Sequence, residues 1–136
     1  MATEPYLQSL KYKEVTVTQD KVEIRKYYYP SGALWVETPC VNGKMHGITK
    51  RYYESGAIEW EIPYVNDREH GILKRYYESG TLSWEIPYVN GGRHGVATHY
   101  DKDNTNIACL KLYKINREVS TLRCDGHGAV SKKSYI

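Results

Sequence analysis

A period of 24 residues runs along most of this chain and limits what it can fold into. Residues 46–65 and 70–89 are nearly identical, and a less complete copy precedes them from Tyr28 to Val41. Other residues that recur at this interval are Gly32, Gly56 and Gly80; Gly47, Gly71 and Gly95; Pro39, Pro63 and Pro87; and Asn42, Asn66 and Asn90. A unit this short cannot bury its own apolar side, so such units stack on their neighbours. The sequence therefore predicts one array of stacked repeats.

Each unit has the pattern of two short strands and two tight turns. Apolar residues alternate with polar residues or proline in segments 58–64 and 82–88, and a period of two indicates a strand with one buried face. Asn42-Gly43 and Glu54-Ser55-Gly56 are turn sequences, since glycine permits the positive φ of tight hairpins. No segment carries the 3.6-residue apolar stripe of a helix. We predict an all-β fold, an elongated and twisted antiparallel sheet of tandem 24-residue β-hairpins. Eight or nine strands about 4.8 Å apart would span on the order of 40 Å.

The prolines and the two ends of the array modify this simple picture. Proline at 39, 63 and 87 cannot donate to a strand ladder, so we expect a bulge or a local break there. Asn104 stands where a turn glycine is expected, and such degenerate end units are typical of caps. The length fits a single domain over 1–136. We divide it into a cap strand in 1–23, repeats in 24–104 and a C-terminal cap segment in 105–136.

Composition and targeting signals favour a cytoplasmic protein. The N-terminus lacks the basic leader and apolar core of a signal peptide, and no stretch approaches the roughly 20 apolar residues of a transmembrane helix. The three cysteines, Cys40, Cys109 and Cys124, lack paired spacing, which argues against a disulfide framework. A net charge of +3 is too weak to indicate a direct nucleic-acid partner.

The order Tyr-Tyr-Glu-Ser-Gly, then Pro-Tyr-Val-Asn-Gly, then His-Gly resembles the MORN-type repeat, above all its bacterial variant. The resemblance covers residues 24–104. It implies an elongated β-hairpin array that binds other proteins or, in eukaryotic relatives, acts as a membrane-associated scaffold; some bacterial members are labelled antitoxins. Two residues depart from the pattern, since Asp67 replaces a turn glycine and Cys40 replaces the tyrosine found at 64 and 88.

Metal-binding and catalytic interpretations find little support in the residue spacing. His46, His70 and His94 recur two strands apart, about 9–10 Å, whereas zinc ligands must gather about 2 Å from one ion. We therefore expect each histidine to pack and hydrogen-bond in its turn. Cys109, Cys124 and His127 match no established metal site. Cys124-Asp125-Gly126-His127 contains the residue types of a nucleophile and its base, but adjacency in sequence does not place a base within hydrogen-bond reach of a nucleophile, so we predict no enzyme activity and no cofactor.

Anionic surfaces are an alternative class of partner. Lys50-Arg51-Tyr52-Tyr53 and its copy at 74–77 place basic and aromatic residues side by side, as at phospholipid or nucleic-acid surfaces. The glutamates at 37, 61 and 85 interleave with them, and we expect a solvated strand face on which Arg51 and Arg75 pair with these acids. Lys50 could lie over Trp60 as a cation–π pair.

Protein binding is the interpretation we favour. The even-numbered strand face, which includes Trp60 and Trp84, needs a cover that a single-layer sheet does not supply. Trp35 falls one residue out of step with these tryptophans, so it either points to the more polar face or is returned to the core by a bulge. We predict a non-catalytic binder, such as an antitoxin, immunity factor or inhibitor of a bacterial or phage system, with anionic membrane lipid as the alternative partner. A homodimer through a sheet face or edge also fits. The predicted partner-binding residues are Trp35, Glu37, Arg51, Tyr53, Glu61, Arg75, Tyr77 and Glu85.

Overall fold

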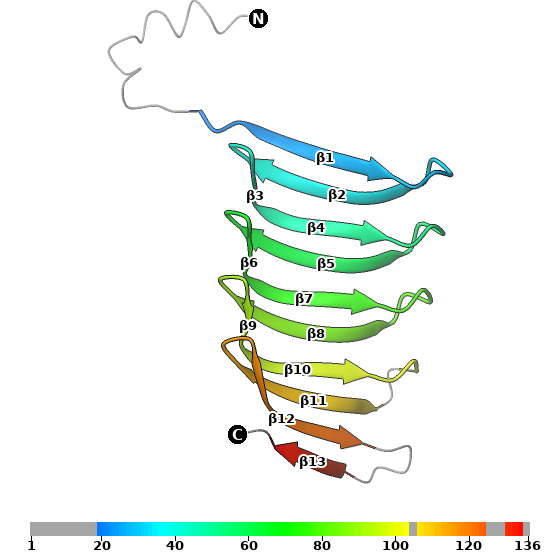
Figure 1. The fold of residues 1–136 in the computed structure, drawn as a ribbon. Coiled ribbons are helices and arrows are strands. Elements are labelled where there is room, and N and C mark those ends of the chain that lie inside the picture. The colour runs from blue at the N-terminus through cyan, green and yellow to red at the C-terminus, as the bar shows by residue number, and fades with distance from the viewer. Residues whose placement is uncertain (1–18, 104–105, 125–129, 135–136) are drawn as a thin grey trace, which may run out of the picture.

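The computed structural model describes residues 19–103, 106–124 and 130–134, and these form a single antiparallel sheet with no helix (Figure 1). The all-β prediction is therefore confirmed. Most of the cap strand predicted in 1–23 lies outside the described residues, and so does Asn104. No described segment is a helix long and apolar enough to cross a bilayer.

Ten strands follow one another across the sheet in chain order. They are β1 (Val22–Tyr28), β2 (Leu34–Val41), β4 (Gly47–Tyr52), β5 (Ile58–Val65), β7 (Gly71–Tyr76), β8 (Leu82–Val89), β10 (Gly95–Tyr100), β11 (Ile107–Lys114), β12 (Arg117–Cys124) and β13 (Val130–Ser134). Three strands of two residues, β3 (Lys44–Met45), β6 (Arg68–Glu69) and β9 (Gly92–Arg93), pair with the ends of β2, β5 and β8. The sheet has more strands than the eight or nine expected, because β11 to β13 continue it beyond the repeats.

The loops that start with asparagine lie in a row along one side of the array, at the ends of β2, β5 and β8. Both central residues of each turn have positive φ, as in Asn42 (52°) and Gly43 (82°), which is the type I′ hairpin geometry. Asp67 adopts a φ of 69° in place of glycine, and its Oδ1 accepts a hydrogen bond of 2.7 Å from the N–H of Met45. The Asp67 N–H in turn donates to the Met45 carbonyl at 2.9 Å, so consecutive loops are joined to one another.

The expected break at the prolines is present. The carbonyl of Pro63 accepts a hydrogen bond of 3.0 Å from His70, the residue that separates β6 from β7. The backbone nitrogen of Pro63 points to the same neighbouring segment as its carbonyl, because the N and O of a strand residue face the same neighbour. Proline has no N–H to donate there, so the strand ladder is interrupted. Strand β5 accordingly pairs with β7 only through Trp60–Arg75 and Glu61–Lys74.

A β-bulge recurs near the start of β2, β5, β8 and β11, at the end of the strands opposite the asparagine loops. The register shifts so that Trp35, Glu59, Ser83 and Ala108 are each an extra residue with no partner on the preceding strand. Position 35 is therefore equivalent to 59 and 83, which are one period away. The bulge turns Trp35 to the side of Arg51, whose guanidinium lies 5.7 Å from the Trp35 ring. This is also the side of the core residues Thr38 and Cys40, but Trp35 itself remains 38% exposed.

The core of this single layer lies on one face and consists of small and medium side chains together with Tyr113. Cys40, Leu73, Ala97 and Cys109 are buried there, and Thr49 donates a hydrogen bond of 3.2 Å to Thr38. Cross-strand pairing puts Trp60 and Trp84 on this same side, which we call the tryptophan face. The other side, which includes Ile48 and Ile72, is the isoleucine face. No second layer of described residues covers either face (Figure 1).

Candidate functional site

Basic and aromatic side chains alternate in a row across the tryptophan face. Arg51 lies opposite Trp60 on the next strand, and Arg75 lies opposite both Trp60 and Trp84. His99 continues the row beyond Trp84. The order Arg51–Trp60–Arg75–Trp84 results from the repeat, since the hairpins β4–β5 and β7–β8 each contribute one arginine paired with one tryptophan. His99 occupies the equivalent position of β10.

Ring contacts hold this row in place. The guanidinium of Arg75 lies 5.1 Å from the ring centroid of Trp60, a cation–π distance. The ring of His99 stacks on Trp84 with centroids 4.5 Å apart and planes 22° apart. Burial, and then the positive charge of Arg75, lower the pKa of His99, so the neutral ring is favoured in this stack.

Trp35 joins the row through its bulge. The guanidinium of Arg51 lies 5.7 Å from the Trp35 ring, and the ring of Tyr29 is 6.1 Å away. Glu59, at the next bulge, forms ion pairs with Arg51 at 3.3 Å and with Arg75 at 4.0 Å. We call Trp35, Arg51, Glu59, Trp60 and Arg75 the Trp–Arg cluster. The side chains of Arg51 and Arg75 remain 45% and 42% exposed.

The recurring glutamates do not belong to this cluster. Each accepts a hydrogen bond from a tyrosine hydroxyl of the next repeat on the isoleucine face: Glu37 from Tyr52 at 2.6 Å, Glu61 from Tyr76 at 2.5 Å and Glu85 from Tyr100 at 2.7 Å. Burial, and then the bonded glutamate, raise the pKa of Tyr52 and of Tyr76 to about 12. The expected pairing of these acids with Arg51 and Arg75 was wrong, because the arginines point to the opposite face and pair with Glu59 instead.

Tyr53 and Tyr77 each precede a Glu-Ser-Gly turn, on the side of the sheet that we call the turn edge, and they connect consecutive repeats. The Tyr53 hydroxyl donates a hydrogen bond of 2.7 Å to the carbonyl of Tyr76, and the Tyr77 hydroxyl donates one of 2.8 Å to that of Tyr100. Of the predicted partner-binding residues, the structure therefore brings together Trp35, Arg51 and Arg75. It places the three glutamates and the two tyrosines within the bonds that stack the repeats.

Sequence reasoning missed the part played by Glu59. A signal was available, because positions 35, 59 and 83 lie one period apart and hold Trp, Glu and Ser, three different residue types, while most of their neighbours recur at least twice. The cation over Trp60 was also assigned incorrectly. Lys50 is paired with Glu61 and so lies on the isoleucine face, while Arg75 takes the place above the ring.

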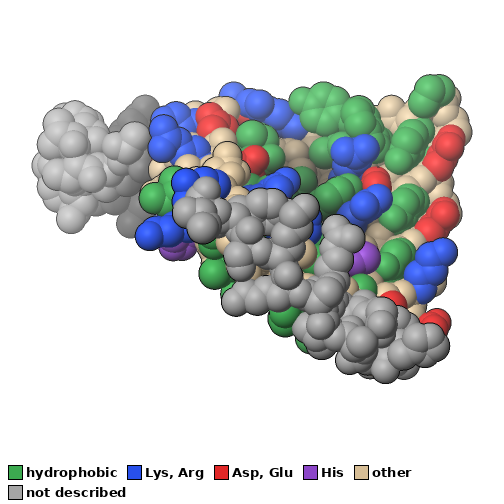
Figure 2. Space-filling model, turned by 60° about the horizontal axis from the view of Figure 1, so that its bottom comes forward, with side chains coloured by type: hydrophobic (Ala, Val, Ile, Leu, Met, Phe, Trp, Pro, Cys, Tyr) green, Lys and Arg blue, Asp and Glu red, His purple; other side chains and the backbone are tan. Residues whose placement is uncertain are grey.

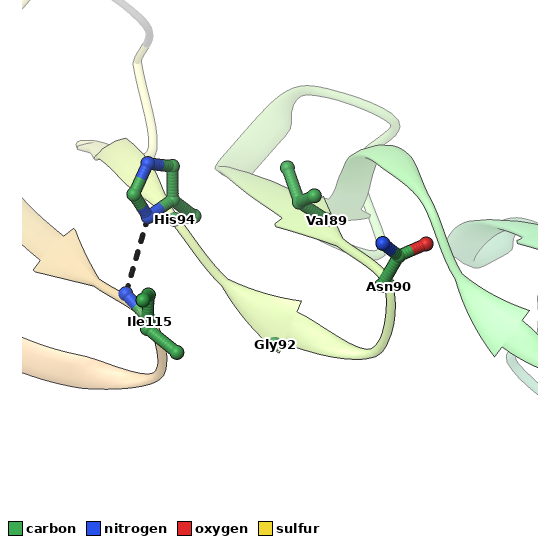
Figure 3. A pocket seen from close by; sticks show the side chains of 5 residues that line it. All are labelled: Val89, Asn90, Gly92, His94 and Ile115. Carbon is green, nitrogen blue, oxygen red and sulfur yellow. Dashed lines mark hydrogen bonds between the residues drawn. The ribbon is translucent and has the colours of Figure 1, made fainter.

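Two of the recurring histidines, His70 and His94, form side-chain hydrogen bonds to the next loop along the sheet. Nδ1 of His70 accepts a bond of 3.3 Å from the N–H of Asn90, and Nδ1 of His94 accepts one of 3.1 Å from the N–H of Ile115 (Figure 3). A cavity of about 350 Å³ lies beside His94, and Figure 3 shows it lined also by Val89, Asn90, Gly92 and Ile115. The described residues include no group of three or more His, Cys, Asp or Glu placed to hold a metal ion. His127 lies outside them.

Figure 2 shows how charge is distributed over one side of the molecule. Basic and hydrophobic side chains interleave over the visible surface, and acidic side chains lie mostly towards the side of the Tyr-Glu-Ser-Gly turns.

The sequence matches the model of the MORN repeat variant twice, over residues 45–66 and 69–90. The two matches begin 24 residues apart, one period, and support a MORN-type repeat protein. No curated protein matches the sequence.

Proposed function

We propose that this MORN-type repeat protein is a non-catalytic binder that neutralises another protein, as an antitoxin, an immunity factor or an inhibitor in a bacterial or phage system. MORN repeats are typically protein- or membrane-binding modules. The observation that carries the proposal is the Trp–Arg cluster, with Trp35 and two arginines partly exposed on an uncovered sheet face.

The composition of the cluster suits a binding hot spot. Tryptophan and arginine are enriched among the few residues that dominate the affinity of protein complexes. Glu59 holds both guanidiniums before a partner arrives, and the rings of Trp35 and Trp60 fix their orientation. Preorganised side chains lose less conformational entropy when they bind, so more of the contact energy appears as affinity.

Variation within the repeat supports the same surface. Some recurring residues serve the stacking of the units, as the Tyr76–Glu61 bond does, while the recurring Arg51 and Arg75 supply the cations of the cluster. The bulge positions 35, 59 and 83 differ from one another while occupying equivalent places on the sheet. The specificity of binding to this surface would therefore depend on positions 35, 59 and 83, where the repeat does not require one residue type.

The test is co-expression with the proteins encoded beside this gene, followed by affinity purification and a growth assay. We expect the double variant Trp35→Ala/Arg51→Ala to lose the co-purified protein and the rescue of growth. The matched control is Lys74→Ala, a basic residue on the isoleucine face, which should keep both. Retention of the partner by the double variant would remove the Trp–Arg cluster as the binding site, and rescue without any complex would remove neutralisation by binding.

A further inference from the structure

The isoleucine face carries a continuous apolar row that the Trp–Arg cluster does not use. One in-register pair from each hairpin contributes to it: Ile24–Pro39, Ile48–Pro63, Ile72–Pro87 and Val96–Leu112. We call these eight residues the Ile–Pro row. The aliphatic side chains of Ile24, Ile48, Ile72 and Val96 are 60%, 50%, 47% and 53% exposed. Single exposed apolar residues are ordinary, but a contiguous row marks an interaction surface.

The spacing of the row selects one kind of partner. Equivalent residues of successive hairpins are two strands apart, about 9.6 Å. An α-helix rises about 1.5 Å per residue, so its side chains seven positions apart lie about 10.5 Å apart on one side. Side chains on one face of an extended strand recur about every 6.7 Å, which does not match. Strands β4, β7 and β10 lie nearly parallel in Figure 1, so a straight helix can follow several repeats.

Charge gives the helix an orientation. Lys44 and Arg68 lie on the isoleucine face at the loop side of the row, paired with Val41 and Val65. Lys114 and Arg117 are paired with each other at the same edge, and all four cations are exposed. At the other side of the row, lysines alternate with glutamates, as in the pairing of Lys50 with Glu61 and of Lys74 with Glu85, so their charges offset. Carboxylates of a partner are therefore attracted on the loop side of the row and not on the other side.

We infer that the Ile–Pro row docks an amphipathic α-helix of a partner protein, with apolar side chains at heptad spacing and acidic side chains along the flank that faces Lys44 and Arg68. The helix lies across the strands, so that each heptad contacts one repeat. This surface is on the opposite face from the Trp–Arg cluster, and the inference goes beyond the proposed function without depending on it.

The experiment uses the full chain and a synthetic helical peptide of about 22 residues, which spans three repeat steps. The peptide carries leucine at heptad spacing and glutamate along one flank. One control peptide has the same composition with the leucines moved off the heptad, and a second replaces the glutamates with lysine. Fluorescence anisotropy should show binding of the heptad peptide, accompanied by a gain of helical circular dichroism, and no binding of the control with displaced leucines.

Variants connect binding to the row. Ile48→Ser and Ile72→Ser should each weaken binding by about tenfold, because each removes one isoleucine from the buried contact. The double variant Lys44→Glu/Arg68→Glu, at two exposed positions, should reject the glutamate peptide and accept the lysine peptide. Arg25→Ala, at an exposed arginine on the tryptophan face outside the Trp–Arg cluster, should bind as the unchanged chain does.

Equal binding of the two leucine arrangements, or unchanged binding by the serine variants, would overturn the inference. Liposomes of phosphatidylcholine and phosphatidylglycerol provide the remaining arm. If the chain co-sediments with them through the same isoleucines and binds no peptide, the row is a lipid surface and the helix inference is wrong.

Discussion

The hydroxyl of Tyr53 donates a hydrogen bond of 2.7 Å to the carbonyl of Tyr76, one repeat further along the chain. The same bond joins Tyr29 to Tyr52 at 2.6 Å. The turn edge of the sheet is thus joined by side chains rather than by the strand ladder, which is short between β5 and β7. The pairs Tyr52-Tyr53 and Tyr76-Tyr77 each serve two neighbours, since the first tyrosine bonds back to a glutamate and the second bonds forward to a carbonyl.

Removing this hydroxyl should destabilise the array. Tyr53→Phe leaves the ring in place and deprives the Tyr76 carbonyl of its partner, so we expect a loss of about 1 kcal/mol in the free energy of unfolding. Urea denaturation followed by circular dichroism measures the loss. Tyr28→Phe is the matched control, since Tyr28 is 58% exposed and its hydroxyl has no bond to the described residues. A control variant as destabilised as Tyr53→Phe would contradict the role assigned to the bond.

Alkaline pH should weaken the fold through Tyr52 and Tyr76. Burial and the bonded glutamates raise the pKa of both residues from 10.0 to about 12 in the folded chain. A raised pKa means that the folded state favours the protonated phenol, so this contribution is fully present below pH 10 and is lost as the pH rises towards 12.

Urea denaturation at a series of pH values across this window tests the pH dependence. Tyr76→Phe should reduce the pH dependence, because one of the tyrosines whose pKa is raised is then absent. Glu61→Gln removes the charge and should lower the pKa of Tyr76, measured by the ultraviolet absorbance of tyrosinate. An identical pH profile in the unchanged chain and in Tyr76→Phe would exclude Tyr76 as the cause.

The glycine of the His-Gly step is required for two separate reasons. Gly71 has a φ of 124°, and a Cβ atom there would lie 3.1 Å from Cγ of Pro63. Gly56 has a φ of 96° but nothing within 4 Å of such an atom. We expect Gly71→Ala to be destabilised by about 1–3 kcal/mol, and more than Gly56→Ala, which bears only the conformational cost. Equal losses in urea denaturation would show that the contact with Pro63 adds nothing.

Ile115 is a point at which the chain can be stabilised. Its φ of 49° is unfavourable for a β-branched side chain, and Asn42, Asn66 and Asn90 occupy the equivalent turn position in the repeats. Ile115→Asn keeps the backbone N–H that bonds to His94, so we expect a gain of about 1 kcal/mol and a higher Tm. Ile115→Val, which is also β-branched, should give no gain. A fall in Tm on asparagine substitution would show that the Ile115 side chain contributes more than the turn strain costs.

The sequence by itself determined the repeat unit, the strands and the turns. Alternation in 58–64 and the Asn-Gly turns are local properties, because side-chain direction along a strand and positive φ in a turn depend on a few consecutive residues. The break at Pro63 was predictable for the same reason, since the missing N–H belongs to the residue. Three members of the candidate surface, Trp35, Arg51 and Arg75, were also named from the sequence.

Only the tertiary structure decided on which face of the sheet each of these side chains lies and which other residues it contacts there. Strand register between repeats is set by the loops and by the bulges at Trp35 and Glu59, and a shift of one residue moves a side chain to the opposite face. Arg75 therefore meets Glu59 and Trp60, while the glutamate two residues further on, Glu61, meets Tyr76 on the other side. The Ile–Pro row became visible for the same reason, since its members are a full period apart in the chain and adjoin only when the hairpins are stacked.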